Sequence, residues 1–149
     1  MPGALPDTNV WLAALFNTHP LHSMARQVLQ QATFAEPAVF CRATQQSFLR
    51  LASTPTLLKA CGAESLTNRD ALIALDTPQA LDQVCARAEP PGLFVVWRTF
   101  ATRDGASPTV WMDAYLAAFA IAGGLRMVTL DGDFKNFVPQ GLDLVWMTP

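Results

Sequence analysis

Short apolar stretches alternate with helix-forming stretches along this chain, and the alternation limits the folds that it can adopt. The segments with the length and composition of strands are Ala4–Pro6, Pro37–Cys41, Leu93–Trp97, Met127–Leu130 and Leu142–Met147. Helices are predicted at Thr8–Phe16, Leu21–Ala35, Ala43–Ala52, from the Thr67 cap to Leu75, from Thr77-Pro78 to before Pro90, and at Pro108–Ala122. Strands that alternate with helices predict an α/β fold, in which helices cover both faces of a parallel sheet.

Length and composition predict one domain that spans residues 1–149. A chain of 149 residues, 51% of them hydrophobic, can bury a core without disulfide bonds or structural zinc. Its cysteines are odd in number and lack a CxxC spacing, and we expect Cys41 and Cys85 to be buried thiols, with Cys61 as the third cysteine. No apolar stretch reaches the ~18 residues of a membrane span. The first residues lack the basic start of a signal peptide, so we expect a cytoplasmic protein.

Three aspartates lie in strongly apolar surroundings. Asp7 and Asp131 each follow a predicted strand, and the carboxyl ends of strands in a parallel sheet are where ligands bind. Asp113 lies near the start of a helix that is apolar nearly all round and is therefore expected to be buried. Burying a carboxylate is costly unless something positive compensates its charge. The three positions together predict one shared cation.

Each aspartate taken alone has a simpler explanation. Asp7 is also a good N-cap for the helix that follows it. Asp113 is also placed where a helix dipole stabilises a negative charge. The dipeptide Asp131-Gly132 is a strong hairpin-turn signal, although the residues after Asp133 do not form a clean second strand.

Clustered carboxylates would equip the chain for phosphodiester hydrolysis. Mg²⁺ and Mn²⁺ prefer oxygen ligands, and a metal ion there polarises the phosphoryl oxygen, activates water and neutralises developing charge. The formal net charge is −2, so the chain without Asp7, Asp113, Asp131 and Asp133 would carry +2. Most of the basic residues are arginines, which suit phosphate binding. This charge distribution is also compatible with an ordinary, mildly acidic protein.

Four segments, in this order and spacing, carry a family resemblance: Leu5–Val10, Cys41–Leu51, Trp111–Ala117 and Thr129–Phe134. Across nearly the whole chain the sequence resembles PIN-domain ribonucleases, in particular VapC-type toxins of bacterial toxin–antitoxin pairs. The resemblance implies a three-layer α/β/α sandwich with a central parallel sheet, and Mg²⁺-dependent endonucleolytic cleavage of RNA. It also implies inhibition by a small antitoxin protein, and commonly a homodimer. It further implies that Asp7, Asp113 and Asp131 are metal ligands, joined by Asp133 directly or through water.

The sequence departs from the PIN-domain pattern at Gln45, where the family usually has a glutamate. Glutamine keeps a carbonyl ligand but loses a charge, so we expect Gln45 to orient water or phosphate in the catalytic site. The alternative function is a PIN-like module that binds RNA or protein with weak or no nuclease activity. An unrelated phosphate-binding protein or hydrolase has no support, because the chain contains no GxGxxG, P-loop or GxSxG motif.

Other side chains have predicted supporting roles. Thr8 or Asn9 is expected to fix the carboxylate of Asp7 by a hydrogen bond. Arg42 and Arg50 are candidates for contact with the RNA backbone, or else form a solvated helix surface. The tryptophans are expected in the core or at a dimer interface: Trp11, Trp97, Trp111 and Trp146.

Overall fold

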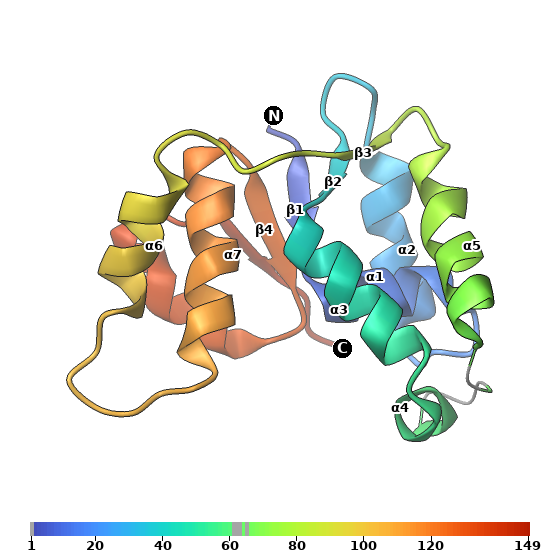
Figure 1. Cartoon of the computed structure of the whole chain (residues 1–149). Coiled ribbons are helices and arrows are strands. Elements are labelled where there is room, and N and C mark those ends of the chain that lie inside the picture. The colour runs from blue at the N-terminus through green and yellow to red at the C-terminus, as the bar shows by residue number, and fades with distance from the viewer. Residues whose placement is uncertain (1, 61–63, 65) are drawn as a thin grey trace.

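A parallel five-stranded sheet forms the centre of the computed structural model, which describes residues 2–60, 64 and 66–149 (Figure 1). The strands are β1 (Ala4–Pro6), β2 (Ala38–Phe40), β3 (Val84–Ala86), β4 (Arg126–Thr129) and β5 (Leu144–Trp146). Their order across the sheet is β3-β2-β1-β4-β5, and every neighbouring pair is parallel. The predicted parallel sheet is therefore confirmed. Cys61 lies outside the described residues.

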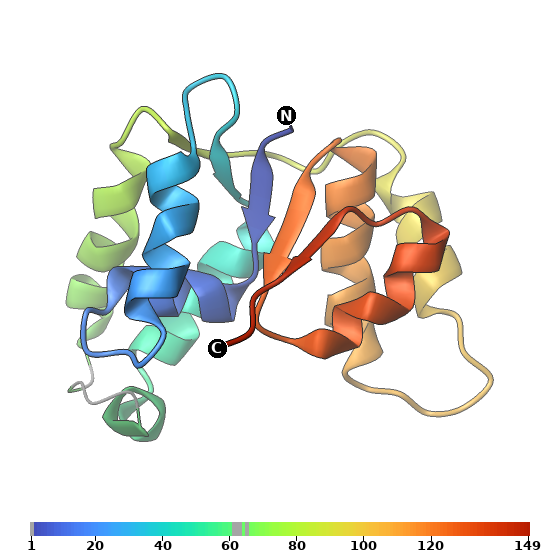
Figure 2. The ribbon, with the colours of Figure 1, turned by 180° about the vertical axis from the view of Figure 1, so that it is seen from behind.

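Helices cover both faces of this sheet. The helices of the described residues are α1 (Thr8–Leu15), α2 (His22–Gln31), α3 (Arg42–Ala52), α4 (Pro55–Ala60), α5 (Asn68–Gln79), α6 (Leu93–Ala101), α7 (Val110–Ala122) and the 3-10 helix η1 (Gly132–Gln140). In Figure 1, α3 and α7 lie in front of the strands, and the reverse view in Figure 2 has α2 in front of them. This arrangement confirms the three-layer α/β/α sandwich.

The strand predicted at Leu93–Trp97 is wrong, because this segment forms the first turns of α6. Its apolar residues follow a helical period: Leu93, Phe100 and Ala101 are buried, while the intervening Phe94 and Val95 are exposed. The helix packs this face against α7. A short apolar run fits a buried strand and a buried helix equally well, so tertiary contacts decide between them.

The helix predicted from Thr77-Pro78 to Pro90 is also wrong. The helix that begins after the Thr67 cap continues to Gln79, since a proline in the last turn removes few helical hydrogen bonds. The chain then forms β3, which completes one edge of the sheet by pairing with β2. Three apolar residues are too few to show a strand period, so the sequence gives no clear signal for β3.

Buried side chains of the strands attach the helices to the sheet. Leu5, Val39 and Met127 are fully buried and belong to one cluster with the inner face of α7. On the opposite side, the ring of Trp11 stacks on that of Phe40, with 3.7 Å between the ring centroids. These contacts hold the first turns of α1, α3 and α7 near the carboxyl ends of their neighbouring strands.

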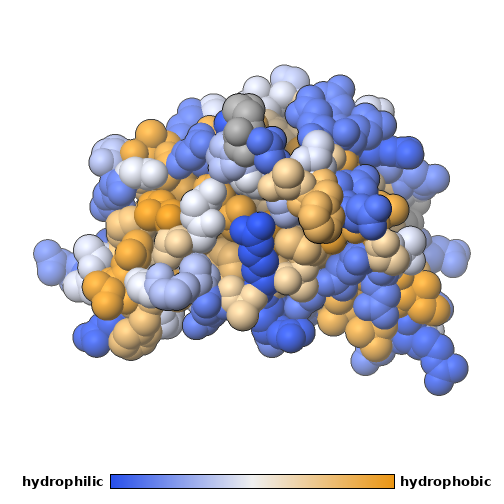
Figure 3. All heavy atoms as spheres, turned by 90° about the horizontal axis from the view of Figure 1, so that it is seen from above, coloured by the Kyte–Doolittle hydropathy of each residue, from blue (hydrophilic) through white to orange (hydrophobic). Residues whose placement is uncertain are grey.

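The remaining predictions about core and surface have mixed outcomes. Cys41 is buried as expected, whereas Cys85 is only half-buried. Trp11 lies in the core, whereas Trp111 and Trp146 are exposed, so for these two the predicted dimer interface is the alternative that stays a prediction. Among the described residues no helix has both the length and the apolar composition needed to cross a bilayer. Seen from above, polar and apolar side chains are interspersed over the molecular surface (Figure 3).

Candidate functional site

Asp7 and Asp131 follow neighbouring strands and meet at the same edge of the sheet. Strand β1 pairs in parallel with β4, with Pro6 opposite Val128. The backbone N–H of Asp7 donates to the carbonyl of Val128 over 2.8 Å, which extends the pairing past the end of β1. The topology therefore brings together two acids that are far apart in the sequence.

Three carboxylates converge beside this edge. One carboxylate oxygen from each of Asp113, Asp131 and Asp133 lies within 4.8 Å of the other two. Asp113 is in the first turn of α7, while Asp131 caps η1 by accepting a hydrogen bond of 2.9 Å from the backbone N–H of Asp133. The hairpin alternative for Asp131-Gly132-Asp133 is thus wrong, because these residues begin a 3-10 helix. Such a group of oxygens has the composition of a Mg²⁺ or Mn²⁺ site.

Thr129 links Asp7 to this cluster. Its hydroxyl donates to Oδ2 of Asp7 over 3.0 Å and accepts from the backbone N–H of Asp131, also over 3.0 Å. The side chain of Thr129 is fully buried at the end of β4. The predicted supporting role of Thr8 or Asn9 therefore falls largely to Thr129. A polar residue inside the apolar strand predicted at Met127–Leu130, two positions before Asp131, was the available sequence signal.

The other oxygen of Asp7 is held by the start of α1. Its Oδ1 accepts the backbone N–H of Thr8 over 2.7 Å, so Asp7 is indeed the N-cap of this helix. Capping uses one carboxylate oxygen and Thr129 uses the other. The side-chain oxygen of Asn9 is buried without a hydrogen-bond partner. The hydrogen bonds that Asp7 accepts come from Thr8 and Thr129, and among the described residues none comes from the side-chain nitrogen of Asn9.

Burial and repulsion by neighbouring charges make the carboxylates of Asp7 and Asp113 reluctant to ionise. The pKa of Asp113 is raised from 3.8 to about 6, first by burial and then by the charges of Asp131, Asp7 and Asp133. The pKa of Asp7 is raised as well, because burial and the charge of Asp131 outweigh its hydrogen bonds from Thr8 and Thr129. Within the described residues, no lysine or arginine forms an ion pair with any of the four aspartates. The site accumulates negative charge that a divalent cation would compensate.

Gln45 lies on the first turns of α3 and is turned toward other partners. Its side-chain oxygen accepts from Nη1 of Arg42 over 2.9 Å, and its nitrogen donates to Oε1 of Gln79 over 2.7 Å. Gln45 is buried, and no hydrogen bond joins it to the four aspartates. The structure therefore brings together the predicted acids and leaves Gln45 in a separate polar contact between α3 and α5.

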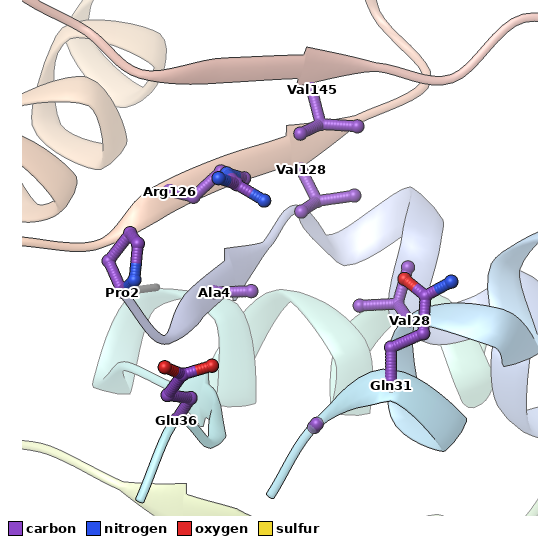
Figure 4. Close-up of a pocket in the computed structure, with 9 residues that line it drawn as sticks. Pro2, Ala4, Val28, Gln31, Glu36, Arg126, Val128 and Val145 are labelled. Carbon is purple, nitrogen blue, oxygen red and sulfur yellow. The ribbon is translucent and has the colours of Figure 1, made fainter.

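A cavity of about 150 Å³ lies apart from the acids, between α2 and the strands (Figure 4). It contains none of the predicted site residues. Its lining includes Ala4 and Arg126, which begin β1 and β4, so the cavity lies toward the amino ends of the strands. The acids occupy the opposite ends. This cavity is therefore not an extension of the carboxylate cluster.

Comparison with known proteins agrees with this geometry. The PIN domain family model matches residues 4–138. Ribonuclease VapC41 from two strains of Mycobacterium tuberculosis, CDC 1551 / Oshkosh and ATCC 25618 / H37Rv, is 48% identical over 136 residues, which cover 89% of this chain and 92% of the relative.

A solved structure supports the same assignment at the level of the fold. Mycobacterium tuberculosis VapC20, described as a sarcin-ricin loop cleaving toxin, matches with a TM-score of 0.62 and 18% sequence identity, covering 99% of this chain and 100% of the other. The topology, the convergence of the acids and these likenesses lead to one conclusion: the chain belongs to the PIN-domain family and is of the VapC type.

Proposed function

We propose that this protein is a metal-dependent endoribonuclease that acts as the toxin of a toxin–antitoxin pair. The observation that carries the proposal is the convergence of carboxylate oxygens of Asp113, Asp131 and Asp133 within 4.8 Å of one another, with no ion pair to a lysine or arginine among the described residues. Similarity to Ribonuclease VapC41 supports RNA as the substrate. The cytoplasm, which holds the RNA of a bacterial cell, is the proposed location. We propose residues 1–149 as a single nuclease domain.

Asp113, Asp131 and Asp133 would hold Mg²⁺ or Mn²⁺ through their carboxylate oxygens. When bound, the metal would polarise the phosphodiester and lower the pKa of water. Asp7 completes the acidic set, with Thr129 fixing its Oδ2 and the start of α1 fixing its Oδ1. Because Thr129 also accepts the backbone N–H of Asp131, one hydroxyl joins the Asp7 carboxylate to the backbone that carries Asp131.

A second candidate function is a PIN-like module that binds RNA or protein with little cleavage. The observation in its favour is Gln45, which replaces the glutamate usual in the family. Its neutral amide contributes no charge to the acidic cluster, and it is hydrogen-bonded to Arg42 and Gln79. The nuclease proposal accordingly assigns catalysis to Asp7, Asp113 and Asp131. Gln45 is proposed to orient water or phosphate there, beside Arg42, which donates to it and is exposed at the start of α3.

Protein partners are part of the proposal. We propose that the chain forms a homodimer and is inhibited by a small antitoxin protein. Large apolar side chains are exposed on neighbouring helices: Phe94 and Val95 on α6, and Trp111 and Met112 on α7. Exposed apolar side chains that lie together are typical of surfaces that bind another protein.

Cleavage of RNA by the purified protein tests the function. Structured RNA is incubated with the wild-type protein in Mg²⁺, in Mn²⁺ or in EDTA, beside Asp7→Asn and the control Asp104→Asn, which removes an exposed charge from the α6–α7 loop. We expect metal-dependent cutting by wild type and control, and a loss of at least ~100-fold in Asp7→Asn. Absence of cutting by the folded wild-type protein in both metals would favour the binding module.

A further inference from the structure

The indole of Trp146 lies against the segment that carries Asp131 and Asp133. Its Nε1–H donates to the carbonyl oxygen of Leu130 over 3.3 Å. The ammonium nitrogen of Lys135 lies over the same ring, 3.4 Å from its centroid. A single side chain of β5 therefore contacts residues on both sides of the two acids.

Gly132, between the acids, fits closely under this indole. A Cβ atom added at Gly132 would lie 3.2 Å from Cζ2 and 3.4 Å from Cε2 of Trp146, closer than most Cβ contacts. The backbone of Gly132 is not in the left-handed region, which only Gly92, Gly124 and Gly141 adopt among the described residues. The close approach of the ring thus favours glycine here, whereas the backbone conformation does not demand it.

We propose that Trp146 is a positioning residue for the metal centre, since its indole supports the Asp131-Gly132-Asp133 turn and holds the Lys135 ammonium away from the carboxylates. The proposal rests on the proposed function. Asp131 lies between Leu130 and Gly132, both of which contact the ring, so the ring limits movement of its carboxylate.

The contact of Trp146 with Lys135 supports the metal centre by keeping the positive ammonium group on the indole ring. Lys135 follows Asp133 by two residues in η1, so its ammonium is the cation closest to these acids in the sequence. The face of an indole attracts a cation, and the observed position uses this attraction. In the described residues Lys135 forms no ion pair with the acids, which leaves their oxygens for a metal ion.

Direct titration of the full chain with Mn²⁺, followed by calorimetry without RNA, tests this inference. Trp146→Ala is expected to weaken Mn²⁺ binding about tenfold, as is typical when a residue that orients ligands is removed. Gly132→Ala is expected to have a similar effect, because its methyl group pushes the turn away from the ring. In the double variant, Gly132→Ala should add less than about twofold, since the methyl group no longer meets an indole.

Two further variants keep the result interpretable. Trp146→Phe retains a ring over Gly132 and Lys135 but loses the hydrogen bond to Leu130, so we expect an intermediate affinity; it replaces Trp146→Ala if that variant fails to fold. Val145→Ala is the control, because Val145 lies on the same strand and lines the cavity of Figure 4. It should bind Mn²⁺ like the wild type.

The outcomes separate the two proposals. If wild type binds no Mn²⁺, the metal-dependent function itself fails. If wild type binds Mn²⁺ and the Trp146 and Gly132 variants bind it equally well, only the positioning role of Trp146 is refuted. Fully additive losses in the double variant would also overturn it, because they would mean that Gly132 and Trp146 act independently.

Discussion

Replacing Asp113 with asparagine should stabilise the metal-free protein while it weakens metal binding and RNA cleavage. Asp113 lies in the first turn of α7, close to Asp131 and Asp133. Its carboxylate is half-buried and surrounded by like charges, which raise its pKa from 3.8 to about 6. Asparagine keeps the shape of the side chain and removes the charge. Stability gained with function lost is the expected signature of a site that holds a cation.

The sign and size of the effect follow from this pKa. A folded chain whose acid has a raised pKa loses stability as pH rises from 3.8 to about 6, and the loss is complete above that range. The difference in pKa corresponds to at most ~3 kcal/mol. Because Asp113 is only half-buried, solvent screening reduces the expected penalty to ~1 kcal/mol. Asp113→Asn should recover this amount at neutral pH.

Urea denaturation in EDTA measures the difference. At about pH 7.5, Asp113→Asn should be more stable than wild type by ~1 kcal/mol, or roughly 3 °C in Tm. At about pH 4.5 the gain should shrink, because Asp113 of the folded wild type is then protonated. The control Asp104→Asn removes an exposed charge and should show neither effect. The reasoning would be refuted by a variant that is no more stable than wild type at neutral pH, or by a gain that is equal at both pH values.

Further predictions concern the same site. Gln45→Leu should lower the free energy of unfolding in urea by ~1 kcal/mol, because it leaves Oε1 of Gln79, 2.7 Å away, without its donor; unchanged stability would contradict this hydrogen bond. Thr129→Val should slow RNA cleavage about tenfold and Thr129→Ser should restore it, since the hydroxyl holds Asp7; equal rates for the two variants would argue against that role. Calorimetric Mn²⁺ affinity should rise with pH through about 6 as Asp113 ionises, whereas a flat profile would exclude Asp113 as a ligand.

The sequence was sufficient to predict the class of fold and to predict which acids lie together at one edge of the sheet. Asp7 and Asp131 follow short apolar strands, and the geometry of a parallel sheet places such residues at one edge whatever the detailed packing. The apolar surroundings of Asp113 made an uncompensated charge improbable on energetic grounds. Patterns of this kind are local, so they can be read without knowing which segments touch.

Tertiary structure decided the features that depend on contacts between distant segments. Leu93–Ala101 is a helix because one of its faces packs on α7, and Val84–Ala86 is a strand because β2 pairs with it. The link from Thr129 to Asp7 and the contact of Gly132 with Trp146 join residues on different strands and turns.

Gln45 likewise has a contact with a distant segment that the sequence alone does not reveal. Its position in the middle helix matched the family pattern, but its partner Gln79 comes from α5, 34 residues away. The chain alone determined which groups were available for chemistry. The packing of α3, α5, α7 and β5 determined which of them meet, because a side chain takes its hydrogen-bond partners from its neighbours in space and not from its neighbours in sequence.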